Sequence, residues 1–220
     1  AQPLEIGCDV ASYGLDFTSM HVRWGGSSMK HESYQGWGAK RIFERLKALA
    51  MECADMINAT KPASAARVDS HRIPIKIDDD PEGRAISDFL QNEGYHVIPI
   101  GAATRSISGL YPNMRSELWF QLAKRARAGE VSFARLPKEV RERMRQQAMA
   151  VQWYLDGQGR RVCEPKEETK LKIGRSPDDM DSCNLSYLQG MDYQPAPEVV
   201  PNERREVFDP ERKPRRKLFG

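Results

Sequence analysis

The chain opens with alternating apolar and polar residues that predict a β-strand. The first run, Leu-Glu-Ile-Gly-Cys-Asp at residues 4–9, places three apolar side chains on one face of an extended backbone. The run Ile-Pro-Ile-Lys-Ile-Asp at residues 73–78 alternates in the same way, and the two runs end in Asp9 and Asp78. Sites in open α/β sheets gather at the carboxyl ends of strands. If these two strands are parallel neighbours, both carboxylates therefore emerge at one edge of the sheet.

The pattern up to residue 100 predicts an α/β fold. Two further strands joined by a Gly-Gly turn extend the first strand into an antiparallel meander. A later strand–helix–strand unit implies a parallel pair with a right-handed crossover. The expected elements are strands near 19–24 and 27–34, a helix near 39–58, the strand that ends at Asp78, a helix near 82–92 and a strand near 95–100. They predict a mixed sheet flanked by helices.

The second half of the chain predicts two basic helices, a hairpin and a short acidic helix. The expected elements are helices near 112–128 and 137–150, a β-hairpin made of 151–156 and 160–164, and a helix from Pro177 to Leu188. Ser176 is the expected N-cap of the last helix, because its hydroxyl suits the cap and proline suits the first turn. From about residue 191 onward, prolines and charges dominate without apolar periodicity. We therefore expect one domain over 1–190 and a tail over 191–220.

The last helix carries a third candidate carboxylate, Asp181. This residue lies at the border of the apolar face marked by Met180, Cys183 and Tyr187. A bare carboxylate there costs on the order of several kcal/mol to desolvate, so a cation or a partner has to offset it. Asp178, one turn earlier, is a candidate accessory ligand, although the helix dipole is the simpler explanation for an acid at that position.

Three aspartates without histidine or cysteine favour a hard divalent cation, Mg²⁺ or Mn²⁺. Each acid alone is more simply a turn residue; the joint placement of Asp9, Asp78 and Asp181 at the ends of apolar elements favours a metal site. Two ions about 4 Å apart can activate a water and stabilise the leaving oxygen of a phosphodiester. Asp9, on the central strand, is the expected bridge between the ions.

Positive charge is concentrated in one stretch of the chain. The net charge of +3 is too small to indicate nucleic acid, but residues 121–147 hold eight basic residues against three acids. A basic surface beside an acidic pocket suits a protein that grips a polyanion and binds metal, although a solvated helix face explains the stretch about as well. The candidate DNA contacts are Lys124, Arg125, Arg127, Arg141, Arg143, Arg145 and Lys166.

The sequence lacks the motifs that mark several other classes of protein. There is no G-x-x-x-x-G-K-[ST] phosphate loop, no G-x-G-x-x-G after a strand and no serine in a nucleophile elbow. The four cysteines are too widely spaced for a zinc site and are expected to be reduced core thiols of a cytosolic protein. No apolar run approaches the roughly 18 residues of a membrane helix.

Four parts of the chain resemble the nuclease domain of the large terminase subunits of tailed bacteriophages. Residues 7–18, Gly-Cys-Asp-Val-Ala-Ser-Tyr-Gly-Leu-Asp-Phe-Thr, resemble the opening motif of that family, and residues 77–80, Ile-Asp-Asp-Asp, its second acidic motif. Residues 111–119 are similar to its Asn-x-Arg-x-Glu-x-Trp segment. The closing motif is the most specific, and it is matched by Glu-Pro-Lys-Glu-Glu at 164–168 and Gly-Arg-Ser-Pro-Asp-Asp-Met-Asp-Ser at 174–182. The resemblance extends over about residues 4–190.

This resemblance implies a ribonuclease H-like fold and a two-metal endonuclease that cuts concatemeric viral DNA during genome packaging in the host cytoplasm. Asp9, Asp78 and Asp181 match the catalytic acids of the family. An ATPase domain precedes the nuclease domain in that family, so we expect this chain to be the C-terminal part of a longer motor, with the portal and the small terminase subunit as further partners. The chain departs from the family at Pro81 and Ala85, where glycine is usual, and the loop after Asp78 is expected to differ accordingly.

Two alternatives to a nuclease remain at the level of sequence. One is a packaging module that grips double-stranded DNA without cutting it. The other is a fragment of an actin-like phosphotransferase, because such enzymes open with a similar strand, aspartate and hairpin. They also need a second domain and glycine-rich adenosine motifs, which this chain lacks.

Overall fold

A five-stranded mixed sheet forms the centre of the protein. The structure is a computed structural model that describes residues 3–11, 16–189 and 215–217. The strand order is β3-β2-β1-β4-β5, with β1 antiparallel to β2 and parallel to β4. The strands are β1 (Leu4–Asp9), β2 (Phe17–Trp24), β3 (Ser27–Gln35), β4 (Ile75–Asp78) and β5 (Val97–Ile100). The predicted meander followed by parallel strands is confirmed.

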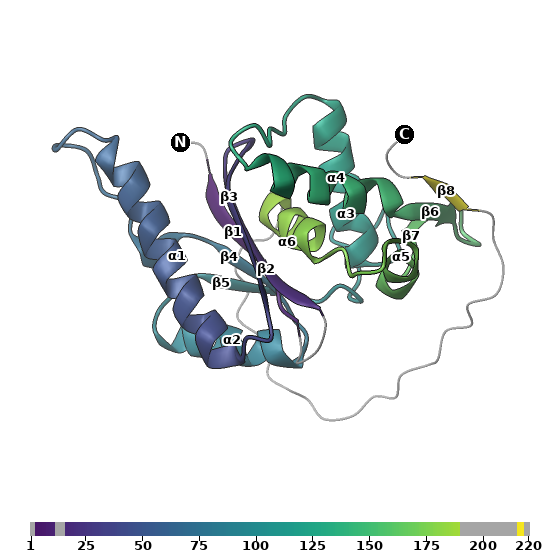
Figure 1. Ribbon diagram of the computed structural model, residues 1–220, viewed down its shortest axis with the longest axis horizontal. Coiled ribbons are helices and arrows are strands. Elements are labelled where there is room, and N and C mark those ends of the chain that lie inside the picture. Colours follow the sequence, from purple (N-terminus) through teal and green to yellow (C-terminus); the bar gives the residue numbers. More distant parts are fainter. Residues whose placement is uncertain (1–2, 12–15, 190–214, 218–220) are drawn as a thin grey trace.

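Helices cover both faces of this sheet (Figure 1). The helices α1 (Ala39–Ala59) and α2 (Pro81–Asn92) pack on one face, and α3 (Met114–Arg127) and α6 (Asp178–Tyr187) lie on the other. Outside them are α4 (Lys138–Ala150) and α5 (Lys166–Ile173), which contact each other. The result is a three-layer arrangement in which α6 is buried between the sheet and the outer helices.

The two faces of the sheet differ chemically because side chains alternate along each strand. On the α1 side, residues such as Ile6, Cys8 and Ile77 join the main apolar core. On β1, β2 and β4 most of the alternate positions on the α6 side are polar, and they include Asp9, Ser19, His21, Arg23, Lys76 and Asp78. Both predicted strand-end aspartates therefore point to the polar side, where α6 lies.

Gly7 allows α6 to lie directly on β1. A β-carbon at Gly7 would overlap the carbonyl oxygen of Ser182 and crowd the backbone nitrogen of Ser186. The other end of α6 is held by cations, since Arg23 and Lys76 donate to the carbonyl oxygens of Ser186 and Leu188. Cations at a helix C-terminus complement its dipole. These contacts fix the helix, and hence its acidic first turn, against the strands.

The start of α6 differs from the sequence prediction. Ser176 was the expected N-cap, but Pro177 occupies that position and no side chain of the cap residue donates or accepts there. Instead, the side-chain oxygen of Gln147 on α4 accepts from the backbone N–H of Met180 at 2.9 Å. The prediction was wrong because a residue from another helix satisfies this N–H, which no local motif reveals.

A second, smaller sheet lies beside the outer helices. The predicted hairpin forms as β6 (Gln152–Leu155) and β7 (Arg161–Cys163), and β6 also pairs antiparallel with β8 (Arg215–Lys217). The strand β8 falls within the predicted tail, 191–220. The rest of that segment, 191–214 and 218–220, lies outside the described residues, so the boundary at residue 190 stays a prediction.

All four cysteines are buried and free, as predicted. Among the described residues, no helix combines the length and the apolar character needed to span a membrane.

Candidate metal centre

The edge where β1 and β4 end brings the predicted aspartates together. Cys8 is paired with Ile77, so Asp9 and Asp78 follow side by side at the carboxyl ends of two parallel strands. Asp181 reaches the same place from the first turn of α6. The three acids line one cavity of about 50 Å³, together with Arg115 and Lys166. Residues separated by more than 170 positions thus share one site.

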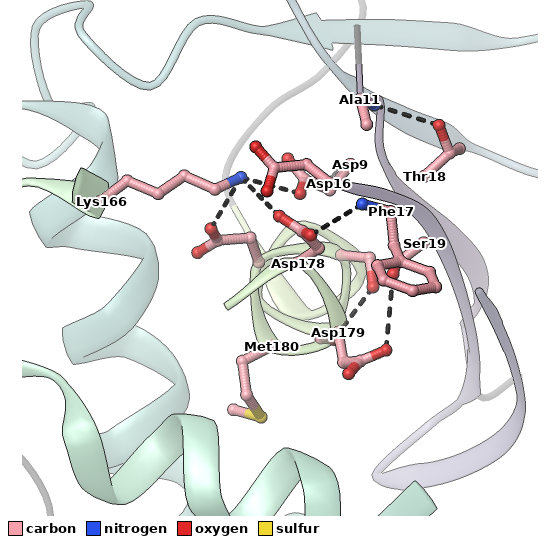
Figure 2. Close-up of polar contacts among 12 residues, drawn as sticks. Asp9, Ala11, Asp16, Phe17, Thr18, Ser19, Lys166, Asp178, Asp179 and Met180 are labelled. Atoms are coloured by element: carbon pink, nitrogen blue, oxygen red, sulfur yellow. Dashed lines mark hydrogen bonds and ion pairs between the residues drawn. The ribbon is translucent and has the colours of Figure 1, made fainter. Parts of the chain in front are cut away.

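Lys166, the first residue of α5, projects into this acidic cluster. Its Nζ lies 2.9 Å from Asp9 Oδ2, 3.0 Å from Asp178 Oδ1 and 3.3 Å from Asp181 Oδ2. Figure 2 shows the lysine reaching across from α5 to the carboxylates of β1 and α6. One ammonium group therefore neutralises part of the charge of three nearly buried acids.

The electrostatics of the cluster follow from burial and like charge. Burial raises the pKa of Asp9 well above its ordinary value; Lys166 opposes this shift, and the carboxylates of Asp178, Asp181 and Asp78 add to it. Burial also raises the pKa of Asp78 to about 6, again against the effect of Lys166. Burial alone would lower the pKa of Lys166, but Asp9, Asp181 and Asp178 raise it well above its ordinary value. A site of this kind favours any cation that can satisfy the carboxylates.

Two neighbours fix the carboxylate of Asp181. Arg115 Nη1 lies 3.3 Å from Asp181 Oδ1, and the indole Nε1–H of Trp119 donates to the same oxygen at 3.1 Å. Arg115 is itself held by the backbone carbonyl of Glu164 at 3.2 Å. Charge complementarity and hydrogen bonds to fixed donors orient this acid toward the cavity.

Asp178 belongs to the cluster, whereas Asp179 does not. Asp178 Oδ2 accepts from the backbone N–H of Phe17 at 3.1 Å, while its other oxygen faces Lys166. Asp179 points away from the lysine toward Ser19 (Figure 2). It accepts from His31, Ser33, Arg143, Gln147 and Arg175. These donors outweigh burial and hold the pKa of Asp179 far below its ordinary value.

Asp79 and Asp80, which follow Asp78, make contacts at the start of α2. Asp80 caps α2 by accepting from the backbone N–H of Gly83 at 2.6 Å, and Asp79 pairs with Arg84 at 3.0 Å. Pro81 is the first residue of α2, so the chain enters the helix directly. A β-carbon at Gly83 would overlap the carbonyl oxygen of Asp78, so glycine is needed there.

The predicted DNA-binding residues fall on different parts of the surface. Lys124 and Arg127 are exposed near the C-terminal end of α3, and Arg125 donates to the carbonyl oxygen of Tyr187 at the far end of α6. The length of α6, ten residues or about 15 Å, separates this group from the acids. On α4, Arg141 and Arg145 are exposed and Arg143 pairs with Asp179. Lys166 faces the acids. Whether these residues bind DNA stays a prediction.

Three residues of the site were not assigned by sequence reasoning. Arg115 and Trp119 stand four positions apart on α3, and therefore on one face of that helix, and both contact Asp181. Lys166 was counted as a DNA contact, yet its Nζ lies within the acid cluster. The available signal was the resemblance of residues 111–119 and 164–168 to family motifs, because burial alone also explains Trp119, which packs in an apolar core.

The chemistry of the donors fits a hard divalent cation. Asp9, Asp78, Asp178 and Asp181 offer only carboxylate oxygens, which Mg²⁺ and Mn²⁺ prefer. Within the described part of the chain, no three such side chains are placed to share an ion as they stand. Asp9, Asp178 and Asp181 instead surround the ammonium of Lys166. A divalent ion at this place would have to displace Lys166, whose side chain is 31% exposed.

The fold defined by this sheet, with acids at the ends of β1 and β4, is ribonuclease H-like. No protein-family model matches the sequence, and no curated protein is similar enough to match either. Solved structures match closely in shape. The nuclease domain of the large terminase subunit gp2 of bacterial virus Sf6 aligns over 86% of this chain and 89% of its own, with TM-score 0.66 and 15% identity.

Two further solved structures share the fold. A lysine-to-alanine mutant of the same Sf6 domain, with manganese and beta-thujaplicinol, reaches TM-score 0.69 at 15% identity over 86% of this chain and 89% of that one. The large terminase nuclease from thermophilic phage G20c with bound cobalt has TM-score 0.56 and 19% identity over 85% of this chain and 81% of that one. At these identities the comparison establishes the fold.

Proposed function

We propose that this protein is a divalent-metal-dependent nuclease that hydrolyses phosphodiester bonds in DNA. The observation that carries the proposal is the convergence of Asp9, Asp78 and Asp181 on one cavity at the strand-end edge of a ribonuclease H-like sheet. Structural neighbours with this fold are nuclease domains, and some hold manganese or cobalt. Fold alone does not define chemistry, so the proposal depends on the acids that line the cavity of this protein.

The carboxylates of Asp9, Asp78 and Asp181 would hold the metal, with Asp178 as an accessory ligand. We propose two ions, Mg²⁺ or Mn²⁺, which would supply an activated water and stabilise the leaving oxygen. Asp9 ends the central strand and interacts electrostatically with Asp178, Asp181 and Asp78, so it is the bridging candidate. Arg115 and Trp119 keep Asp181 oriented. Lys166 neutralises the acids before metal binds.

The biological setting rests on the resemblance of the motifs to terminase large subunits. We propose that the protein cuts concatemeric viral DNA during genome packaging, in the host cytoplasm. The proposed partners are double-stranded DNA, an ATPase domain of the same polypeptide, the portal and the small terminase subunit. The acid cluster supports only the cutting step of this proposal; the setting and the partners depend on the resemblance.

A second candidate is a module that grips DNA without cutting it. One observation favours it: Lys166 Nζ occupies the place among Asp9, Asp178 and Asp181 that a cation would take. If the lysine never withdraws, the acids serve stability and the basic surface alone would contact DNA.

Plasmid cleavage separates these candidates. The parent protein, the variant Asp181→Asn and the control Asp88→Asn are each incubated with supercoiled plasmid and Mn²⁺, and binding is measured on the same samples. Asp88 is exposed on α2, and the control makes the same change of charge. We expect the parent and the control to cut and Asp181→Asn to bind without cutting. Binding without cutting by all three proteins would establish the gripping module.

A further inference from the structure

A hollow beside α5 carries positive charge that the metal centre does not use. It has a volume of about 470 Å³ and is lined by side chains from α4, from the end of α5 and from the loop before α6. Arg143, Arg145 and Arg175 are among the lining residues, and no carboxylate lines it within the described part of the chain. A concave surface with three guanidinium groups is suited to an anion.

The buried carboxylate of Asp179 pairs with two of these guanidinium groups, those of Arg143 and Arg175. Arg143 makes a bidentate pair with it, through Nε at 2.6 Å and Nη2 at 3.2 Å, and Arg175 Nη2 lies 3.3 Å from it. Each guanidinium group has five N–H donors, so both arginines keep N–H groups that Asp179 does not use and that can donate to a ligand. Two guanidinium groups against one carboxylate also leave one unit of positive charge. Asp179 therefore orients both arginines but neutralises their charge only in part.

The hollow is connected to the metal centre through Phe17. The Arg175 guanidinium lies over the Phe17 ring, 4.9 Å from its centroid. The backbone N–H of Phe17 donates to Asp178, which faces Lys166. Helix α5 also joins the two places, because Lys166 stands at its start and Ile173 at its end lines the hollow.

We propose that this hollow binds the DNA backbone on one side of the bond that is cut, with Arg175 and Arg143 as the phosphate ligands. The proposal rests on the proposed nuclease function and names the surface that positions its substrate. Seven residues of helix span about 10 Å. One bound duplex is therefore long enough to contact both the hollow and the metal centre.

The variant Arg175→Gln tests the proposal with little risk to folding. Asp179 keeps four donors at shorter distances, from His31 at 2.8 Å, Ser33 at 2.5 Å, Arg143 at 2.6 Å and Gln147 at 2.7 Å. Arg145→Gln is a second variant, because Arg145 is 65% exposed and pairs with Glu142 on the same helix. The control is Arg67→Gln, an equal charge change at an exposed residue beyond the far end of α1.

Binding to a 30-base-pair duplex of random sequence is measured by fluorescence anisotropy in EDTA, so that no metal or cleavage contributes. We expect Arg175→Gln to weaken binding about 3- to 10-fold near 0.1 M salt and to reduce the slope of log affinity against log salt by about 0.9, one phosphate contact. Arg145→Gln should weaken binding in the same direction, and Arg67→Gln should match the parent.

The outcomes separate this proposal from the nuclease assignment. If Arg175→Gln lowers affinity and slope but the parent never cuts in Mn²⁺, the binding surface stands and the nuclease fails. If the parent cuts but Arg175→Gln and Arg145→Gln bind like the parent, the hollow is not the DNA surface. Equal losses in Arg67→Gln, or Arg175-dependent binding of oligoglutamate without binding of the duplex, would also overturn it.

Discussion

Gly7 on β1 and Ser182 on α6 lie backbone to backbone, so closely that a β-carbon on Gly7 would overlap the Ser182 carbonyl oxygen. The variant Gly7→Ala therefore has to push α6 away from the sheet. We expect it to lower the free energy of unfolding by about 1–3 kcal/mol, the usual cost of an overpacked core. Urea unfolding of the two proteins measures the difference. A variant as stable as the parent would show that α6 can shift without cost.

Lys166 competes with metal for the same carboxylates, so removing it should strengthen metal binding. In Lys166→Ala, the oxygens that lie 2.9–3.3 Å from the ammonium lose their cation. We expect the metal-free variant to melt at a lower temperature than the parent and Mn²⁺ to raise its melting temperature by more. A tenfold gain in affinity adds about 1.4 kcal/mol, or roughly 3–6 °C.

The matched control is Lys170→Ala. Lys170 stands one turn further along α5 and pairs with Asp16 at 2.6 Å, so the variant makes the same charge change on the same helix. Its response to Mn²⁺ should equal that of the parent. Equal Mn²⁺ shifts in all three proteins would mean that the ammonium does not occupy the metal position.

Asp78 should make the metal-free protein less stable as the pH rises. Because burial raises the pKa of Asp78 to about 6 in the folded state, against an ordinary value of 3.8, the folded protein binds this proton more tightly than the unfolded chain. Stability from this group is therefore present below pH 4 and is lost as the pH rises through 6. The loss amounts to about 2 kcal/mol after allowance for partial exposure.

The variant Asp78→Asn isolates this effect, since asparagine stays neutral at every pH. The variant and the parent should be about equally stable near pH 4, and the variant should be more stable near pH 7. Urea unfolding in EDTA between these pH values gives the difference. A difference that does not change with pH would show that the Asp78 carboxylate is better solvated than its burial implies.

The sheet could be predicted from the sequence because its signals are local. The alternation in 4–9 and 73–78 fixes which residues face the apolar core, and the aspartates that end these runs then share an edge once the strands are parallel. Helix α5 was not predicted, although Gly174, which has φ +73°, follows it directly as a typical helix-ending residue. Its eight residues are mostly charged, and no apolar periodicity marks them.

The contacts among side chains could not be predicted in the same way. That Lys166 neutralises Asp9 depends on how α5 packs beside the sheet, and 157 positions separate the two residues. Gln147 caps α6 from another helix, so no motif near Ser176 could reveal it. The different directions of Asp178 and Asp179 follow from the rotation of about 100° per residue along a helix, but the partners on each side are tertiary.

Substitution by asparagine should affect metal binding at Asp178 and stability at Asp179. Asp178→Asn keeps an oxygen that can accept from Phe17 and removes one charge from a crowded acidic cluster, so we expect stability within about 1 kcal/mol of the parent and a smaller melting shift with Mn²⁺. Asp179→Asn leaves Arg143 without a buried partner and should cost about 3–5 kcal/mol. The Mn²⁺ shift of the folded Asp179→Asn protein should match that of the parent.

Melting curves with and without Mn²⁺ give both quantities for each variant. Because the two substitutions are chemically identical and one position apart, helix propensity and loss of charge cancel between them. What differs is the set of partners that each carboxylate loses, chiefly Lys166 for Asp178 and Arg143 for Asp179. If Asp179→Asn abolished the Mn²⁺ shift while Asp178→Asn left it intact, the metal would bind on the α4 side of α6, and the proposed centre at the ends of β1 and β4 would be wrong.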